Sequence, residues 1–283
     1  MTERPASETA RRVSIVDSDG IRERKDKLAT EEPLEVRVVV ARESKTVAVT
    51  MRTPGSDFEL AAGFLFAEGI VKSRQQIVQI SYCKDRDLPP EQLYNIVIVE
   101  LDAASRPDLA PLDRHFHISS ACGVCGKASL DSLSLRGVEP VEDGPKVEAS
   151  VIGSLPERLR ERQKLFSSTG GLHAAGLFDP AGELVELRED VGRHNAVDKL
   201  VGWALLDGRV PLTGNLLMVS GRSSFEICQK AVVAGIPLVC SVSAPSSLAA
   251  DVAEEFGMTL IGFVRDGRFN VYTGRERVLG TAG

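Results

Sequence analysis

The chain has 283 residues and a formal net charge of −6 at neutral pH, which is long enough for one large domain or two ordinary ones. This acidic balance disfavours binding to nucleic acid without regard to sequence, because such affinity comes mainly from Lys and Arg that neutralise phosphates. No run of about 18 apolar residues could span a bilayer, and residues 1–30 lack the apolar segment of a signal peptide. We therefore expect a cytoplasmic protein that binds neither nucleic acid nor membrane.

The first part of the chain predicts a tail followed by a strand pair. Residues 1–30 are rich in charged side chains and poor in large apolar ones, which predicts a flexible tail. Alternation of apolar and polar residues over 34–40 and 45–51 predicts two antiparallel strands joined by a polar turn.

A helix is predicted after this strand pair. Ser56 and Glu59 have the spacing of a capping box, and the apolar run behind them predicts a helix that ends near Gly69. Helix capping explains Asp57 and Glu59, so we assign neither of them a functional role. Further strands are predicted at 77–82 and 93–101.

From residue 151 onward, predicted strands and helices alternate. An amphipathic pattern over 155–166 predicts a helix with Pro156 in its first turn. The strands are predicted at 172–178, 183–188, 215–220, 237–243, 259–264 and 269–273, and the helices at 194–206, 223–235 and 246–256. Such alternation is typical of parallel crossovers in a sheet covered by helices, so we expect a three-layer α/β domain. The predicted organisation is a tail at 1–30, a smaller α+β domain at 31–113, a cysteine loop and connection at 114–150, and the α/β domain at 151–283.

Two cysteines, Cys122 and Cys125, are the first candidates for chemistry. The polar run that begins at Lys127 predicts a helix whose first-turn N–H groups, together with the Lys127 charge, would favour a thiolate, which is the nucleophilic form. Gly123 and Gly126 would leave room for the sulfur of another protein. The total of five cysteines is odd, and thiols stay reduced in the cytoplasm, so we expect thiols and not disulfides.

Four interpretations of this pair stay open from the residues alone. A C-x-x-C after a predicted strand fits a disulfide oxidoreductase. A zinc site with His115 and His117 is a second interpretation, although structural zinc sites usually join two separated ligand pairs. A third is a pair of unreactive loop thiols, although inert cysteines usually lie among apolar residues. The fourth is a persulfide carrier in which the second thiol assists delivery by exchange.

Polar loops follow the predicted strands of the second unit, where ligands bind in such sheets. These loops combine small hydroxyl residues with glycine, which can leave backbone N–H groups free to hold phosphate, although N-capping explains each loop taken alone. Two such loops at adjoining strand ends favour a pocket for a phosphorylated ligand. Its predicted lining is His173, Arg193, Ser220, Arg222 and Ser246.

Several other polar or sulfur-bearing residues have simpler explanations. His173 and His194 could act as acid–base groups, but a lone histidine is more often a hydrogen-bonding structural residue. The sequence around Ser223 is not the G-x-S-x-G nucleophile elbow, so a serine hydrolase is not expected. Cys228 and Cys240 lie in apolar segments and are interpreted as core residues.

Five motifs occur in a fixed order along the chain. They read ACGVCGK (121–127), GGLHAA (170–175), REDVGRHNAVDK (188–199), SGRSSFE (220–226) and SAPSSL (243–248). Together they resemble the FdhD/NarQ family of formate dehydrogenase accessory proteins. The likeness also takes in 53–55 and 68–70, so it extends over nearly everything after the first thirty residues.

This resemblance implies a sulfur carrier that accepts sulfur from a cysteine desulfurase and passes it to the molybdenum cofactor before that cofactor enters formate dehydrogenase. Cys122 would carry a persulfide and Cys125 would assist, which makes the protein sulfurtransferase-like. The cofactor, bis(molybdopterin guanine dinucleotide), bears phosphates and guanines that suit the predicted pocket, and GDP could mimic it. A homodimer is also implied. The family's cofactor segment corresponds here to Phe263, Val264, Arg265, Asp266, Gly267 and Arg268, and two arginines in this segment could bind phosphate in bidentate fashion.

The resemblance also implies that the second domain is similar to the cytidine deaminase fold. Zinc deaminases use H-x-E followed by P-C-x-x-C. Here two alanines follow His173 and no P-C-x-x-C occurs, so we expect neither deamination nor a resident metal. The alternative function is a chaperone that binds the molybdenum cofactor and whose cysteine pair is only a redox switch or a zinc site.

Overall fold

The computed structural model describes residues 4–83, 89, 92, 94–105, 138–141 and 144–280. The motif with Cys122 and Cys125, and with it His115 and His117, lies outside these described residues. The interpretations of the cysteine pair therefore stay predictions.

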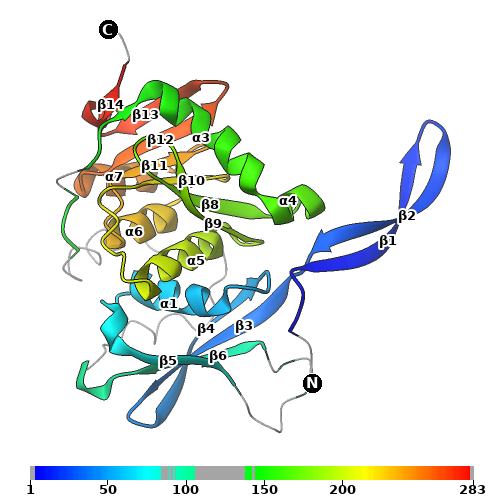
Figure 1. Ribbon diagram of the computed structural model, residues 1–283, viewed down its shortest axis with the longest axis horizontal. Helices are drawn as coiled ribbons and strands as arrows, with labels where there is room; N and C mark the ends of the chain where they lie inside the picture. Colours follow the sequence, from blue (N-terminus) through cyan, green and yellow to red (C-terminus); the bar gives the residue numbers. More distant parts are fainter. Residues whose placement is uncertain are drawn as a thin grey trace.

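The N-terminal segment is a two-stranded ribbon. Strand β1 (Glu8–Asp17) pairs antiparallel with β2 (Gly20–Ala29), and the ribbon projects from the body of the molecule (Figure 1). The sequence predicted a flexible tail over 1–30 and did not foresee these two strands. A prediction from composition does not take account of cross-strand pairs, such as Lys27 with Glu8, whose Nζ and Oε2 atoms lie 2.7 Å apart. The base of the ribbon is also tied to the body, because the Ser7 hydroxyl donates to the Pro54 carbonyl at 2.9 Å.

A four-stranded sheet with one helix follows the ribbon. Its strands are β3 (Glu32–Val40), β4 (Glu43–Arg52), β5 (Ile77–Tyr82) and β6 (Ile96–Leu101), in the order β4-β3-β6-β5. The predicted strand pair is confirmed, and its turn has Ala41 and Arg42 in the left-handed region, which suits the twist of a hairpin. Short 3-10 turns lie at Arg74–Gln76 and Ala103–Ser105.

Helix α1 (Asp57–Ala67) lies where a helix was predicted, but it does not begin with the predicted capping box. Ser56 has a left-handed φ of 54° and makes no side-chain cap bond. Asp57 instead pairs with buried Arg52, and Glu59 pairs with Arg188. The capping explanation of these two acids was therefore wrong, because each carboxylate pairs with an arginine, Asp57 with the nearby Arg52 and Glu59 with the distant Arg188.

The second unit is built on a six-stranded sheet of order β13-β12-β11-β10-β8-β9. Its elements are β8 (His173–Phe178), β9 (Leu184–Asp190), α5 (Arg193–Leu206), β10 (Leu216–Val219), α6 (Phe225–Val233), β11 (Leu238–Ser241), α7 (Ser247–Glu255), β12 (Thr259–Arg265) and β13 (Arg268–Thr273). Strands β10, β11 and β12 are parallel and the other pairings are antiparallel. The predicted alternation and the parallel crossovers are confirmed for this part of the chain.

One face of this sheet is covered by α3 (Ala149–Arg162), which is followed by the short α4 (Lys164–Thr169). Helix α3 begins earlier than predicted, so Pro156 lies in its interior and not in its first turn. Two short strands, β7 (Val147–Glu148) and β14 (Val278–Leu279), pair beside it, and a 3-10 turn at Arg275–Arg277 precedes β14.

The opposite face is covered by α5, α6 and α7, which completes the predicted three layers (Figure 1). The buried cluster on this side also takes in α1 and the four-stranded sheet, so both units contribute to one hydrophobic core. Cys228 and Cys240 are fully buried core residues, as predicted, and burial raises the pKa of Cys228 to about 12. In the described part of the chain, no helix is long and apolar enough to cross a membrane.

Candidate functional site

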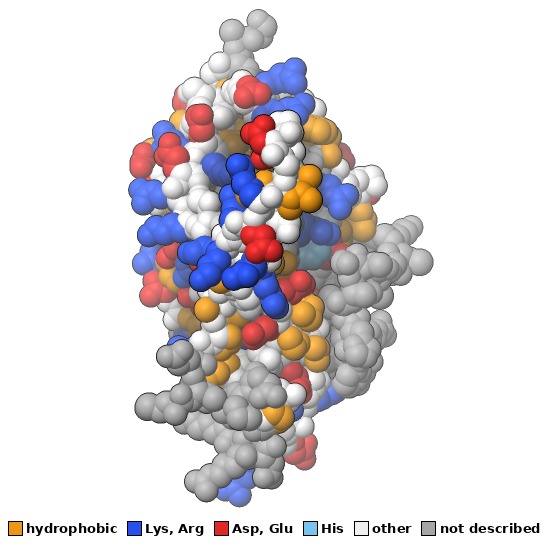
Figure 2. Space-filling view, turned by 90° about the vertical axis from the view of Figure 1, so that its right-hand side faces the viewer, with side chains coloured by type: hydrophobic (Ala, Val, Ile, Leu, Met, Phe, Trp, Pro, Cys, Tyr) orange, Lys and Arg blue, Asp and Glu red, His pale blue; other side chains and the backbone are white. Residues whose placement is uncertain are grey.

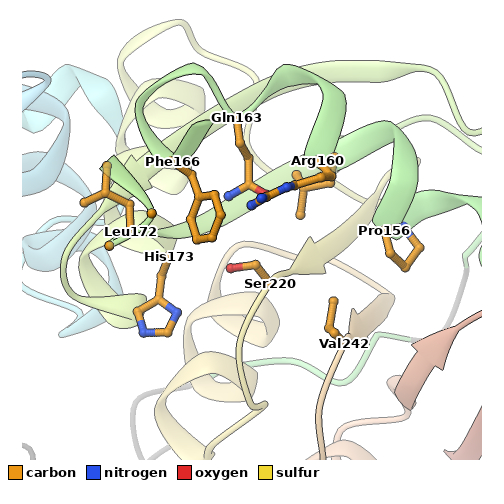
Figure 3. Close-up of a pocket in the computed structure, with 11 residues that line it drawn as sticks. Pro156, Arg160, Gln163, Phe166, Leu172, His173, Ser220 and Val242 are labelled. Carbon is orange, nitrogen blue, oxygen red and sulfur yellow. The ribbon is translucent and has the colours of Figure 1, made fainter. Parts of the chain in front are cut away.

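A pocket of about 540 Å³ opens at the end of the sheet where β10 and β11 finish (Figure 3). Its wall combines the end of α3, the short helix α4, the Gly170–Gly171 turn and the residues that directly follow β10 and β11. The lining residues are Pro156, Leu159, Arg160, Gln163, Phe166, Gly170, Gly171, Leu172, His173, Ser220 and Val242.

The position of α4 in this wall is fixed by an acid from a distant motif. The Glu189 carboxylate accepts hydrogen bonds from the backbone N–H groups of Leu165 and Phe166 at 3.0 and 2.8 Å, which caps the helix. Helix α4 ends at Thr169, and the left-handed φ of 70° at the following Gly170 turns the chain toward β8. Glu189 therefore positions the backbone of Phe166, and with it the ring, in the pocket wall.

Two residues of the predicted pocket, His173 and Ser220, do line this cavity. The Ser220 hydroxyl accepts a hydrogen bond from the backbone N–H of Ala174 at 2.9 Å, which ties the start of β8 to the end of β10. His173 is half-buried, and burial, assisted by the nearby Arg193 charge, lowers its pKa despite the opposing charge of Asp190. His173 is therefore a neutral imidazole at neutral pH.

A second polar cluster lies at the start of α5 and α6. The His194 Nε2 is 3.0 Å from the Ser224 hydroxyl and 3.5 Å from a Glu226 carboxylate oxygen. A catalytic triad would need the carboxylate on the other ring nitrogen, so these residues are not arranged for a serine nucleophile. Burial first, and then the Arg193 charge, lowers the pKa of His194 to about 4.

The pocket wall at His173 and the polar cluster around His194 meet at Gly221. A Cβ added to this glycine would lie 3.3 Å from the His173 Nδ1 and 3.9 Å from the Arg193 Cβ. Any side chain at this position would press on the imidazole, so the glycine keeps the strand-end loop close to both His173 and Arg193.

The loops after β10 and β11 lie side by side, as predicted. The backbone N–H of Ser246 donates to the Ser223 carbonyl at 3.0 Å. The Ser246 hydroxyl accepts from the Ala249 N–H at 3.2 Å, so its role in the structure is that of an ordinary N-cap of α7. The Ser223 hydroxyl is buried and has no hydrogen-bond partner among the described residues. Arg222 is exposed beside it.

The predicted cofactor segment, 263–268, covers the end of β12, the turn at Asp266 and Gly267, and the start of β13. Val264 is fully buried, whereas Arg265, Asp266, Gly267 and Arg268 are exposed. Phe263 has a left-handed φ of 55°, and its N–H donates to the Ser243 carbonyl of the neighbouring loop at 3.2 Å. This segment, Arg193, Arg222 and Ser246 are not among the described residues that line the pocket.

Sequence reasoning missed the α3 and α4 side of the pocket. The Arg160 guanidinium carbon lies 3.8 Å from the centre of the Phe166 ring, and Gln163 between them is 3% exposed. The amphipathic pattern over 155–166 predicted only a helix and assigned these three residues no place in a site. Only the turn at Gly170–Gly171 hinted that this stretch borders a site.

The longest motif is a structural anchor between the two units. The Lys199 ammonium is buried against the Asp190 carboxylate at 2.7 Å and donates to the Thr53 carbonyl at 2.8 Å. The second Asp190 oxygen accepts from Gly192 N–H and the Asn195 amide at 2.8 and 3.0 Å. These contacts hold the turn that carries Arg193 and His194 beside the strand ends. No cluster of potential metal ligands occurs within the described ranges.

These features define a mixed α/β protein with a ligand-sized pocket at the strand ends of its larger sheet. A family model, the FdhD/NarQ family, matches residues 29–279. The chain belongs to this family.

Relatives named as sulfur carrier proteins align with nearly the whole chain. A sulfur carrier protein FdhD from Streptomyces coelicolor is 50% identical over 274 residues, covering 95% of each chain. Another from Sulfurisphaera tokodaii is 46% identical over 254 residues, covering 90% of this chain and 92% of the relative. The fold matches the crystal structure of a candidate formate dehydrogenase accessory protein from Desulfotalea psychrophila. That comparison has a TM-score of 0.73 and 25% identity, and covers 96% and 99% of the two chains.

Proposed function

We propose that this protein is a sulfur carrier in which Cys122 accepts sulfur as a persulfide from a cysteine desulfurase. The observation that carries the proposal is the 50% identity, over 95% of the chain, to a relative named as a sulfur carrier protein. The sulfur would then pass to the molybdenum cofactor, bound as cargo, before its insertion into formate dehydrogenase. The chain would act in the cytoplasm, as a homodimer.

The first transfer is balanced without an external oxidant. The Cys122 thiolate attacks the outer sulfur of the donor persulfide, the donor's S–S bond breaks, and the donor cysteine leaves as a thiolate. In the second step the Cys125 thiolate attacks the Cys122 sulfur. A Cys122–Cys125 disulfide forms and the outer sulfur leaves as sulfide, with both electrons supplied by the thiols. A thiol reductant then restores the pair.

The pocket and the loops beside it supply groups suited to the cargo. The cavity of about 540 Å³ falls in the size range of small-molecule sites. Arg222, Arg265 and Arg268 are exposed around the strand ends, where a guanidinium can bind phosphate in bidentate fashion. The neutral imidazole of His173 can accept or donate a proton in the pocket wall.

The test is a trapping experiment with the full chain, a cysteine desulfurase and cysteine. Mass spectrometry should show a gain of one sulfur atom on the peptide that contains Cys122, and Cys122→Ala should abolish it. Cys83→Ala, a change of a buried free thiol, is the matched control and should leave the gain intact. A gain that persists in Cys122→Ala would contradict the proposal.

The second candidate function is a cofactor chaperone whose cysteine pair is a redox switch. It predicts that formate dehydrogenase still matures in cells that carry Cys122→Ala. Metal analysis of the purified protein separates both functions from a zinc site, because zinc would be found in stoichiometric amount only in the last case.

A further inference from the structure

The wall of the pocket contains a hydrogen-bond donor without a partner. Gln163, between α3 and α4, is 3% exposed, and its Nε2 has no partner among the described residues. Its backbone is fully used, since its N–H donates to the Arg160 carbonyl at 3.3 Å and its carbonyl accepts from Ser167 N–H at 3.0 Å. The helix junction therefore does not need the side-chain amide. A buried donor left unpaired is costly and calls for an explanation.

The surroundings of this amide fit a flat ring. Figure 3 shows the Gln163 amide directed toward the Arg160 guanidinium and the Phe166 ring, with the cavity beside them. The guanidinium lies 3.8 Å from the ring centre, and neither group is a good hydrogen-bond acceptor. The rest of the lining combines apolar side chains, Leu172 among them, with the polar side chains of His173 and Ser220. Apolar walls with a few convergent polar groups are typical of a small-molecule site, and an aromatic face is a platform on which a base stacks.

We propose that this part of the pocket receives a heteroaromatic ring that bears a carbonyl oxygen, and that Gln163 recognises that oxygen. The Nε2 donates to the carbonyl, and the ring stacks on Phe166 in place of the Arg160 guanidinium. Arg160 is exposed, and an exposed cation–ring contact is weak, so its displacement is readily offset once the buried donor is satisfied. The inference rests on the proposed function, because the guanine and pterin rings of the molybdenum cofactor both carry such a carbonyl.

The test compares two nucleotides on the purified full chain by calorimetry. GDP carries the carbonyl, and ADP has an amino group at the same place on its ring. The wild-type chain should bind GDP more tightly than ADP. Gln163→Leu keeps the side-chain volume but removes the donor, so it should weaken GDP binding about tenfold and leave ADP binding unchanged. Gln229→Leu, on α6 and outside the pocket lining, is the matched control and should keep the preference for GDP.

Thermal unfolding of the free variant separates recognition from a structural role. Gln163→Leu removes an unpaired buried donor, so the free variant should unfold at the same or a higher temperature than the wild type. The inference is overturned if the free variant unfolds at a lower temperature, if Gln163→Leu binds GDP as tightly as the wild type, or if the wild type does not prefer GDP. Persulfide formation on Cys122 is measured separately. If the chain forms the persulfide but does not prefer GDP, the proposed function stands and the ring site is wrong. If the chain prefers GDP but forms no persulfide, the ring site stands and the proposed function is wrong.

Discussion

Gly63 of α1 and Gly202 of α5 face each other where the two helices cross. A Cβ added to Gly63 would lie 1.9 Å from the Asp198 carbonyl oxygen, and one added to Gly202 would lie 1.8 Å from the Glu59 carbonyl oxygen. The two helix backbones are therefore in direct contact. Helix α5 begins at Arg193, beside the strand-end loops, so this crossing fixes the N-terminal unit against the element that carries part of the site.

Gly63→Ala should destabilise the protein, because the added methyl group meets backbone and no side chain can move aside. Overpacking of this kind costs about 3 kcal/mol in the free energy of unfolding, measured by urea denaturation. Gly214→Ala is the matched control, since an added Cβ there meets nothing within 4 Å, and its effect should stay within about 0.5 kcal/mol. If the two substitutions change the free energy of unfolding equally, α1 and α5 can move apart at no cost in stability.

Lys199→Met should cost about 3 to 5 kcal/mol of stability, because it leaves the Asp190 carboxylate buried without its cation. Lys199 and Asp190 side chains are 2% and 0% exposed, and their charged atoms lie 2.7 Å apart. Arg12→Met removes one partner of the ribbon pair Arg12–Glu23, whose side chains are 74% and 64% exposed, and should change stability by less than about 0.5 kcal/mol. A loss below about 1 kcal/mol for Lys199→Met would show that N–H donors alone satisfy Asp190.

Much of the fold could be predicted because its apolar periodicity is local. Strand β5 has the predicted limits, and α5 begins within one residue of its predicted start. The ribbon was missed because its stability comes from cross-strand pairs and from its anchoring at Pro54, neither of which composition records. The capping box was wrong for a related reason. The arginines that take Asp57 and Glu59 are Arg52 and Arg188, and the second lies on β9, far along the sequence.

The candidate site could be predicted only in part. Ser220 directly follows β10, and His173 begins β8, which runs antiparallel to β10, so the two residues lie at the same end of the sheet and line one pocket. The sequence grouped these two residues because their loops were expected at that end. Gln163 lies on a helix that only the tertiary fold brings over that edge, and a glutamine within an amphipathic pattern gives no sign that its amide is buried.

Lowering the pH should reduce the free energy of unfolding of the wild-type protein more than that of the His194→Gln variant. Burial, followed by the Arg193 charge, lowers the pKa of His194 to about 4, below the 6.5 expected in the unfolded chain. Between these values the unfolded state binds more protons, so stability is lost as pH falls. For this group the loss between pH 6.5 and 5 is roughly 2 kcal/mol at most, at about 1.36 kcal/mol per pH unit. Urea unfolding at both pH values measures it. The same acid loss in both proteins would show that His194 titrates normally when folded.

Replacing Arg222 and Arg265 together with alanine should weaken binding of GDP, used as a phosphate-bearing probe. Both arginines are exposed near the strand ends, one after β10 and the other at the end of β12. A charge-assisted hydrogen bond contributes about 1.5 to 3 kcal/mol, so losing one should weaken binding about tenfold or more. The weakening should shrink as salt is raised, since phosphate contacts by exposed charges are screened. Arg209→Ala, at an exposed ion pair beyond the C-terminal end of α5, should leave GDP binding unchanged. The double variant could instead bind GDP like the wild type while Gln163→Leu does not. In that case the phosphates of GDP do not contact Arg222 or Arg265, and the nucleotide ring determines binding to this pocket.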